Sequence, residues 1–203
     1  PRCGTPLSNF ELNQPGAYRD VEDQSIYIKF PIPNPPSGEA GSQFPNTYFF
    51  VWTTTPWTLP ANVALAVGKD FNYVMIELAD QGTKLILAKE RLSAISQPYK
   101  IIKEFKGQDL VGWEYEPLYK MKQVLAGYRV VAADFISTTD GTGIVHIAPA
   151  FGEDDMELGR AENLSTPVTV DPEGAVIKGL SIPGEGKFVK LADEDIKADL
   201  RQR

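Results

Sequence analysis

The chain of 203 residues has one cysteine and one histidine, Cys3 and His146. A single cysteine excludes an internal disulfide framework and is typical of a reducing compartment, so we expect a cytoplasmic protein. One thiolate and one imidazole, far apart in the sequence, do not supply the four ligands of a structural zinc site. We therefore predict no metal in this chain.

The sequence also lacks a long apolar run and an excess of positive charge. No apolar run approaches the roughly 18 to 20 residues that span a bilayer, and no basic-then-apolar start resembles a signal peptide. The formal net charge is −7. Proteins that neutralise many phosphates are usually basic, so tight binding of nucleic acid by this chain alone is not expected. Hydrophobic residues make up 42% of the chain, which argues for a folded core.

A stretch rich in threonine, proline and tryptophan runs from Trp52 to Ala61 between two apolar segments, 48–51 and 63–67. Both segments read as buried strands. Pro56 and Pro60 lack backbone donors, so the stretch is predicted to leave the sheet as a stiffened loop. A rigid loop dense in hydroxyls is a candidate binding floor. The alternative is a threonine-rich strand end followed by a proline turn.

Short strands and turns dominate the rest of the chain. Apolar or alternating runs predict further strands over 25–30, 72–78, 83–88, 99–105, 128–135 and 144–149. Helices are predicted over 90–96 and 151–163, and from a capping Asp193 onward. Asp140-Gly141 is a hairpin signal. This pattern favours a β-rich α+β domain, a distorted β-barrel core with a few peripheral helices.

A second stretch, 140–155, carries groups that could do chemistry. A strand ending near His146 and a helix starting near Gly152 would place an imidazole and the Asp155 carboxylate at one cleft. An ionised carboxylate only accepts hydrogen bonds, so an ammonium group is its natural partner. The alternatives are a first-turn carboxylate that favours the helix dipole and a core histidine. No serine lies in a nucleophile-elbow context, which argues against covalent catalysis.

Both stretches resemble one known family. Residues 53–62 read TTTPWTLPAN, which resembles the threonine-rich motif in the editing domain of isoleucyl-tRNA synthetases. The related valyl and leucyl enzymes have an arginine where this chain has Pro56. Residues 140–155 are similar to the second editing signature of the same synthetases. The resemblance implies the editing-domain fold, an insertion within a class I aminoacyl-tRNA synthetase.

The resemblance also implies a function and roles for single residues. The function is proofreading: hydrolysis of mischarged valyl-tRNA(Ile), and of valyl-adenylate, by a positioned water. The resemblance implies that Asp155 anchors the α-ammonium of the substrate and that Thr53, Thr54 and Thr55 hold the terminal adenosine, the ester and the water. Asp155, Thr54 and Thr55 are counted as catalytic, and the substrate-binding residues are Thr53, Asn62, His146 and Trp57. Asn62 holds the loop or touches the substrate, His146 lines the side-chain pocket, and Trp57 packs beside it.

The same resemblance implies the organisation of a larger molecule. Residues 1–203 would be a single monomeric editing domain, with 1–17 and 192–203 as junctions to the remainder of the synthetase. That remainder would grip the tRNA and use ATP, Mg²⁺ and a zinc site of its own, whereas this chain needs no cofactor. Two rival interpretations stay open: a substrate-binding module that is inert in isolation, and a β-barrel interaction domain without a site.

Overall fold

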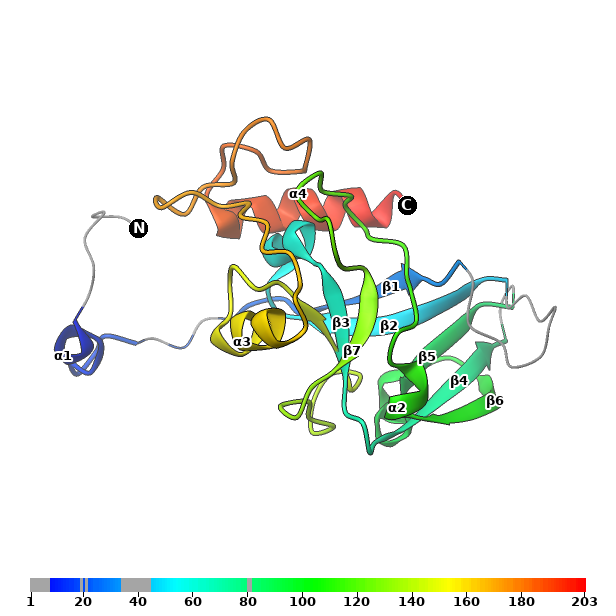
Figure 1. The fold of residues 1–203 in the computed structure, drawn as a ribbon. Helices are drawn as coiled ribbons and strands as arrows, with labels where there is room; N and C mark the ends of the chain where they lie inside the picture. The colour runs from blue at the N-terminus through cyan, green and yellow to red at the C-terminus, as the bar shows by residue number, and fades with distance from the viewer. Residues whose placement is uncertain (1–7, 19, 21, 34–44, 80–81) are drawn as a thin grey trace.

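The computed structural model describes residues 8–18, 20, 22–33, 45–79 and 82–203. Within them, two mixed β-sheets form the body, the longest helix, α4 (Val189–Arg201), runs along one side of it, and the short helix α1 (Asn9–Leu12) stands apart from it (Figure 1). No helix in these ranges has the length and apolar character needed to cross a membrane. Cys3 lies outside the described residues, so the prediction of no zinc stays a prediction.

The larger sheet has five strands in the order β1-β2-β5-β4-β6. Their bounds are β1 Ile26–Pro31, β2 Thr47–Thr53, β5 Lys84–Ala88, β4 Asn72–Leu78 and β6 Tyr99–Lys106. The β2–β5 pair is parallel and the other neighbours are antiparallel. Each of these strands overlaps a segment that the sequence predicts as a strand.

The smaller sheet has three strands in the order β7-β3-β8, with bounds Arg129–Ala132, Ala64–Val67 and Ile144–Ile147. The central strand β3 is parallel to β7 and antiparallel to β8. The predicted hairpin at Asp140-Gly141 is therefore wrong, because the strands on either side of it do not pair with each other. All four residues of β3 are buried, so both faces of this central strand are covered.

The β-rich α+β class is confirmed, but the predicted barrel is not found. In the described part of the chain the strand pairings make two sheets, and they do not close on themselves. The sheets meet where β2 packs beside β8. This contact brings the start of the threonine-rich stretch, Trp52 and Thr53 at the end of β2, next to the part of the 140–155 stretch that forms β8.

Burial along β2 shows which face of this strand carries chemistry. Thr47, Phe49, Val51 and Thr53 are buried, and the residues between them are half-buried. Successive side chains of a strand point to opposite faces, so Thr53 belongs to the face that meets the main core. The strand therefore delivers the first threonine hydroxyl into the interior.

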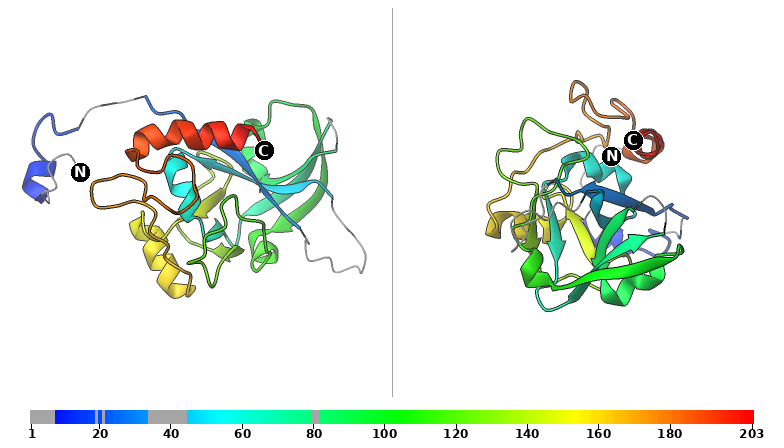
Figure 2. Two further views of the ribbon diagram at one scale, coloured as in Figure 1. Left: turned by 90° about the horizontal axis from the view of Figure 1, so that it is seen from above. Right: turned by 90° about the vertical axis from the view of Figure 1, so that its right-hand side faces the viewer.

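The helices are η1 Pro56–Ala61, η2 Lys89–Ala94, α1 Asn9–Leu12, α2 Gly107–Leu110, α3 Glu153–Ala161 and α4 Val189–Arg201. The predicted stiffened loop is a 3₁₀ helix, η1. The views of Figure 2 show α4 lying over η1. Helix α4 starts four residues before Asp193, so Asp193 is not its cap. Most of 192–203, predicted as a junction, lies in α4, whose Ala192 and Ile196 are buried.

Candidate functional site

Three threonine hydroxyls gather where β2 passes into η1. Thr53 Oγ1 lies 3.3 Å from Thr55 Oγ1 and accepts a hydrogen bond from the Thr55 N–H at 3.1 Å. Thr58 Oγ1 lies 3.2 Å from Thr55 Oγ1 and donates to the Thr55 carbonyl at 2.8 Å. In a 3₁₀ helix, residues three apart eclipse each other, which places Thr58 over Thr55. Thr54, between them, is exposed.

His146 joins these hydroxyls from the neighbouring strand β8. Its Nε2 lies 3.1 Å from Thr58 Oγ1 and 3.4 Å from Thr53 Oγ1. Burial lowers the pKa of His146 to about 4, so the imidazole is neutral at pH 7. Its Nδ1 is buried and has no hydrogen-bond partner among the described residues. The threonine-rich stretch and the 140–155 stretch therefore meet at His146, which lies 88 residues from Thr58 and 93 residues from Thr53 in the sequence.

Asp155 lies in the first turn of α3, close to the end of β8. Its Oδ2 accepts a hydrogen bond from the Ala148 N–H at 2.8 Å, two residues beyond His146. A side chain at Gly152 would place its Cβ 3.2 Å from the Asp155 Cγ, so the glycine leaves room for the carboxylate. Burial raises the pKa of Asp155, and the Asp154 charge adds to this, while the Ala148 N–H opposes it. Asp155 makes no salt bridge with a described residue.

An aromatic contact also ties the two motifs together. The Trp57 ring on η1 meets the Phe151 ring edge-on, with centroids 5.1 Å apart and an angle of 73° between the planes. Phe151 lies in the loop that joins β8 to α3. Trp57 is half-buried and packs against the main core. Its observed role is therefore packing between the threonine stretch and the loop that leads into α3, the helix that carries Asp155.

Asn62 uses its amide inside the protein. Its Nδ2 donates to the Ala64 carbonyl at 2.8 Å, and its Oδ1 accepts from the Tyr115 hydroxyl at 2.6 Å. Asn62 is only 2% exposed. Burial raises the pKa of Tyr115 well above its usual value, which keeps the hydroxyl a donor. Of the two roles predicted for Asn62, the geometry favours holding the loop.

Sequence reasoning missed three residues that support the site: Thr58, Tyr115 and Asp193. The Asp193 Oδ1 accepts from the Trp57 N–H at 2.8 Å, so it satisfies a donor at the start of η1, where helical donors lack partners. The three-residue spacing of Thr55 and Thr58 was a usable signal, given a 3₁₀ helix. No local pattern indicated Tyr115 or Asp193, because their contacts span 53 and 136 residues.

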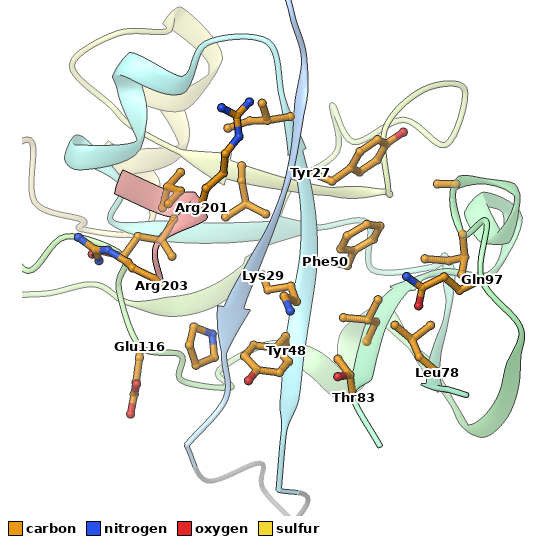
Figure 3. A pocket seen from close by; sticks show the side chains of 18 of the residues that line it. Tyr27, Lys29, Tyr48, Phe50, Leu78, Thr83, Gln97, Glu116, Arg201 and Arg203 are labelled. Carbon is orange, nitrogen blue, oxygen red and sulfur yellow. The ribbon is translucent and has the colours of Figure 1, made fainter. Parts of the chain in front are cut away.

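A separate hollow of about 920 Å³ lies on the other face of β1 and β2 (Figure 3). Tyr27 and Phe50 line it and stack with centroids 5.1 Å apart and planes 10° apart. Lys29 and the end of α4, including Arg201, also line it. We call this hollow the aromatic groove. None of the site residues predicted from the sequence lines it.

Comparison with known proteins shows which proteins this chain is similar to. No family model matches it. It is 46% identical over 198 residues to the isoleucine–tRNA ligase of Clostridium novyi and 43% identical over 197 residues to that of Picrophilus torridus. Both matches cover 97% of this chain. The chain spans only 18% of the length of each of these relatives.

Solved structures with the same fold come from another synthetase. GlLeuRS-CP1 aligns with a TM-score of 0.69 at 17% identity, over 88% of this chain and 95% of that one. The editing domain of the P. falciparum cytosolic leucyl-tRNA synthetase aligns with a TM-score of 0.64 at 14% identity, over 88% and 98% of the two chains. The resemblance inferred from the two motifs is confirmed: the chain corresponds to one region of the isoleucine–tRNA ligases and has the fold of the leucyl-tRNA synthetase editing domains.

Proposed function

We propose that this chain is the hydrolytic proofreading domain of an isoleucyl-tRNA synthetase and that it deacylates valyl-tRNA(Ile) and valyl-adenylate. The similarity to isoleucine–tRNA ligases and the shared fold support it. The observation that carries it is the meeting of the threonine cluster with His146 and of His146's strand with Asp155. A site for an aminoacyl ester needs polar groups for the ester and an anion for the ammonium, and these two motifs supply both.

Energetics explain why a synthetase needs such a site. One methylene changes binding in an apolar pocket by only about 1–3 kcal/mol, and isoleucine against valine at isoleucyl-tRNA synthetase is itself the standard example of this limit. A second site that admits valine and excludes the larger isoleucine removes the errors that remain. The buried His146 ring is proposed to line that side-chain pocket and to limit its size.

Asp155 is proposed to hold the α-ammonium group of the aminoacyl ester. The Ala148 N–H fixes one carboxylate oxygen, and an ionised carboxylate has further lone pairs to offer. Burial without a cationic partner makes the ionised state costly, as the raised pKa of Asp155 shows. A substrate ammonium would relieve that cost, so an unpaired acid in this place favours a cationic ligand.

The threonines are proposed to hold the rest of the substrate and the attacking water. An aminoacyl ester is already activated, so positioning and electrostatic stabilisation of the developing oxyanion can suffice. Thr54 is exposed and Thr55 is half-buried, so both can reach a ligand from solvent. Thr53 is buried and fixes the bend through its bonds to Thr55 and His146. This scheme requires no covalent intermediate and no cofactor from this chain.

The proposed partners are the 3′ end of mischarged tRNA(Ile) and the remainder of a synthetase chain in the cytoplasm. With a net charge of −7 this chain is a poor phosphate binder, so the remainder would supply most of the affinity for tRNA. The domain itself is proposed to be a monomer.

A second candidate is a binding module that holds the valyl group but does not hydrolyse it in isolation. The acidic charge and the 18% coverage of the relatives motivate it. Two measurements on the chain separate the candidates: deacylation of valyl-tRNA(Ile) at high protein concentration, and binding of a non-hydrolysable valyl-adenosine. Binding without deacylation would favour the module. Neither binding nor deacylation would favour an interaction domain without a site.

The direct test of the proposal is Asp155→Ala. We expect this variant to lose both deacylation and binding of the valyl-adenosine, because the ammonium loses its counter-charge. Asp154→Ala, one residue earlier in the same turn, is the matched control and should behave like the parent chain. Unchanged binding and hydrolysis in Asp155→Ala would refute the assigned site.

A further inference from the structure

The Thr58 hydroxyl has one proton, and the structure shows where it goes. Thr58 Oγ1 has three neighbours: the Thr55 carbonyl at 2.8 Å, His146 Nε2 at 3.1 Å and Thr55 Oγ1 at 3.2 Å. A carbonyl oxygen only accepts, so the shortest of these contacts takes the hydroxyl proton. The Thr58 hydroxyl can then only accept a hydrogen bond from His146, because its one proton is used.

A lone pair on Thr58 Oγ1 requires a proton on His146 Nε2. With the proton on Nδ1 instead, lone pairs of nitrogen and oxygen would face each other at 3.1 Å. Nδ1–H would also be a buried donor without a partner among the described residues. A buried donor left unpaired is costly, and unpaired buried N–H groups are rarer in proteins than unpaired acceptors.

Thr53 offers the only rival arrangement among the contacts of Nε2. Its hydroxyl lies 3.4 Å from Nε2 and could donate to an unprotonated nitrogen. This contact is longer than the one to Thr58, and Thr53 Oγ1 is also close to Thr55 Oγ1 at 3.3 Å, to which it can donate instead. The geometry therefore favours Thr58 over Thr53 as the residue that sets the state of the ring.

We propose that Thr58 is a positioning residue that fixes the neutral His146 ring in the Nε2–H form. The ring then keeps Nδ1 unprotonated, as a buried hydrogen-bond acceptor without a partner among the described residues, and it can accept from a water molecule or a ligand group that reaches it. This inference rests on the contacts of the ring and not on the proposed function. Because burial lowers the pKa of His146 to about 4, the ring is neutral at pH 7 and carries a proton on only one of its two nitrogens.

The chain suits a direct experiment, because His146 is its only histidine. Nitrogen-15 NMR of the uniformly labelled chain at pH 7 gives two imidazole nitrogen signals, whose shifts and couplings to ring protons identify the protonated nitrogen. We expect Nε2 to be protonated and Nδ1 to be unprotonated. A parent chain with the proton on Nδ1 overturns the proposal, and this measurement needs no variant.

Substitutions then show which hydroxyl sets the form. Thr58→Val removes the hydroxyl at nearly constant volume, and we expect the proton to redistribute toward Nδ1, with both signals moving toward averaged values. Thr58→Ser should restore the parent spectrum. Thr53→Val should leave the proton on Nε2, as should Thr142→Val, a buried threonine whose hydroxyl bonds the Ile144 carbonyl. An unchanged spectrum in Thr58→Val, or a shift in Thr53→Val alone, overturns the proposal.

Discussion

Strand β2 separates two regions of very different character. On its buried face, Thr53 leads into a cluster of hydroxyls around the enclosed ring of His146. On its other face, Phe50 stacks on the exposed Tyr27 in the open aromatic groove. Size, aromatics and cations would all favour the groove as the binding region. Thr53 and His146, which match the editing motifs, are instead on the buried face.

The state of the charges also distinguishes the two regions. In the groove, Arg203 pairs with Asp199 at 2.8 Å, Lys197 pairs with Glu194 at 2.5 Å, and the Lys29 ammonium lies over the Tyr48 ring, 5.2 Å from its centroid. In the site, Asp155 has no ion pair with a described residue, and the His146 Nδ1 has no hydrogen-bond partner among them. Buried polar groups normally have hydrogen-bond partners, so a buried group without a partner is a stronger sign of a ligand site than an exposed hollow. The more buried region, which holds these unpaired groups, is therefore the better candidate.

Removing the charge of Asp155 should give the largest effect. Asp155→Asn keeps the shape of the side chain but not its charge, and breaking a desolvated charge pair costs about 2–5 kcal/mol. We expect deacylation of valyl-tRNA(Ile), measured as kcat/KM, to fall about 100-fold, which corresponds to roughly 2.7 kcal/mol. Asp154→Asn is the control. Activity of Asp155→Asn within roughly twofold of the parent chain would remove the basis for choosing this region.

Acid should destabilise the buried region through His146. Its folded-state pKa of about 4 lies below the usual 6.5, so the unfolded chain binds more protons in this window. The stability is present above pH 6.5 and is lost as the pH falls toward 4, by about 3 kcal/mol in all. Urea unfolding of the parent chain and His146→Gln across this range measures it. The difference between the two proteins isolates the histidine, and parallel curves would contradict the prediction.

The support of Asn62 should be worth somewhat less. Tyr115→Phe leaves the buried Asn62 Oδ1 without its donor, and an unsatisfied buried group costs about 1–3 kcal/mol. We expect a loss of unfolding free energy in that range by urea titration. Tyr27→Phe is the matched control, because it also removes a tyrosine hydroxyl, but from an exposed ring in the groove. It should change stability by less than about 0.5 kcal/mol. Equal losses in both variants would contradict the contrast between the regions.

Changes to the cations of the groove should have the smallest effect. Lys29 and Arg201 are exposed, and surface substitutions usually change stability by about 0.5 kcal/mol or less. The double variant Lys29→Ala, Arg201→Ala should therefore keep its unfolding free energy and deacylate within roughly twofold of the parent chain. A loss of deacylation comparable to that of Asp155→Asn would show that the groove belongs to the functional region.

The sequence predicts most strands of this fold and little of their arrangement. The period of two and the apolar runs indicated β2, and for Asn72–Leu78 the predicted limits equal those of β4. The insertion of β3 between β7 and β8 was missed, because the Asp140-Gly141 turn reads locally as a hairpin. A local pattern does not determine which strand completes a sheet, since that depends on long-range burial.

The candidate site was also predictable only in part, because local motifs indicate its residues but not the long-range contacts that hold them. The motifs named Thr53, His146 and Asp155, and the structure brings their segments together. The residues that hold the site were not visible, because Asp193 reaches the Trp57 N–H across 136 residues. Asp193 was instead predicted as a helix cap, which its position in the sequence allowed but the earlier start of α4 excluded.

A structure of this chain bound to a non-hydrolysable valyl-adenosine tests the central claim most directly. We predict that the ammonium group bonds the Asp155 carboxylate, that the isopropyl group lies beside His146, and that the adenosine contacts the Thr53–Thr55 bend. An adenosine stacked against Tyr27 or Phe50 in the aromatic groove, with Asp155 untouched, would contradict the account.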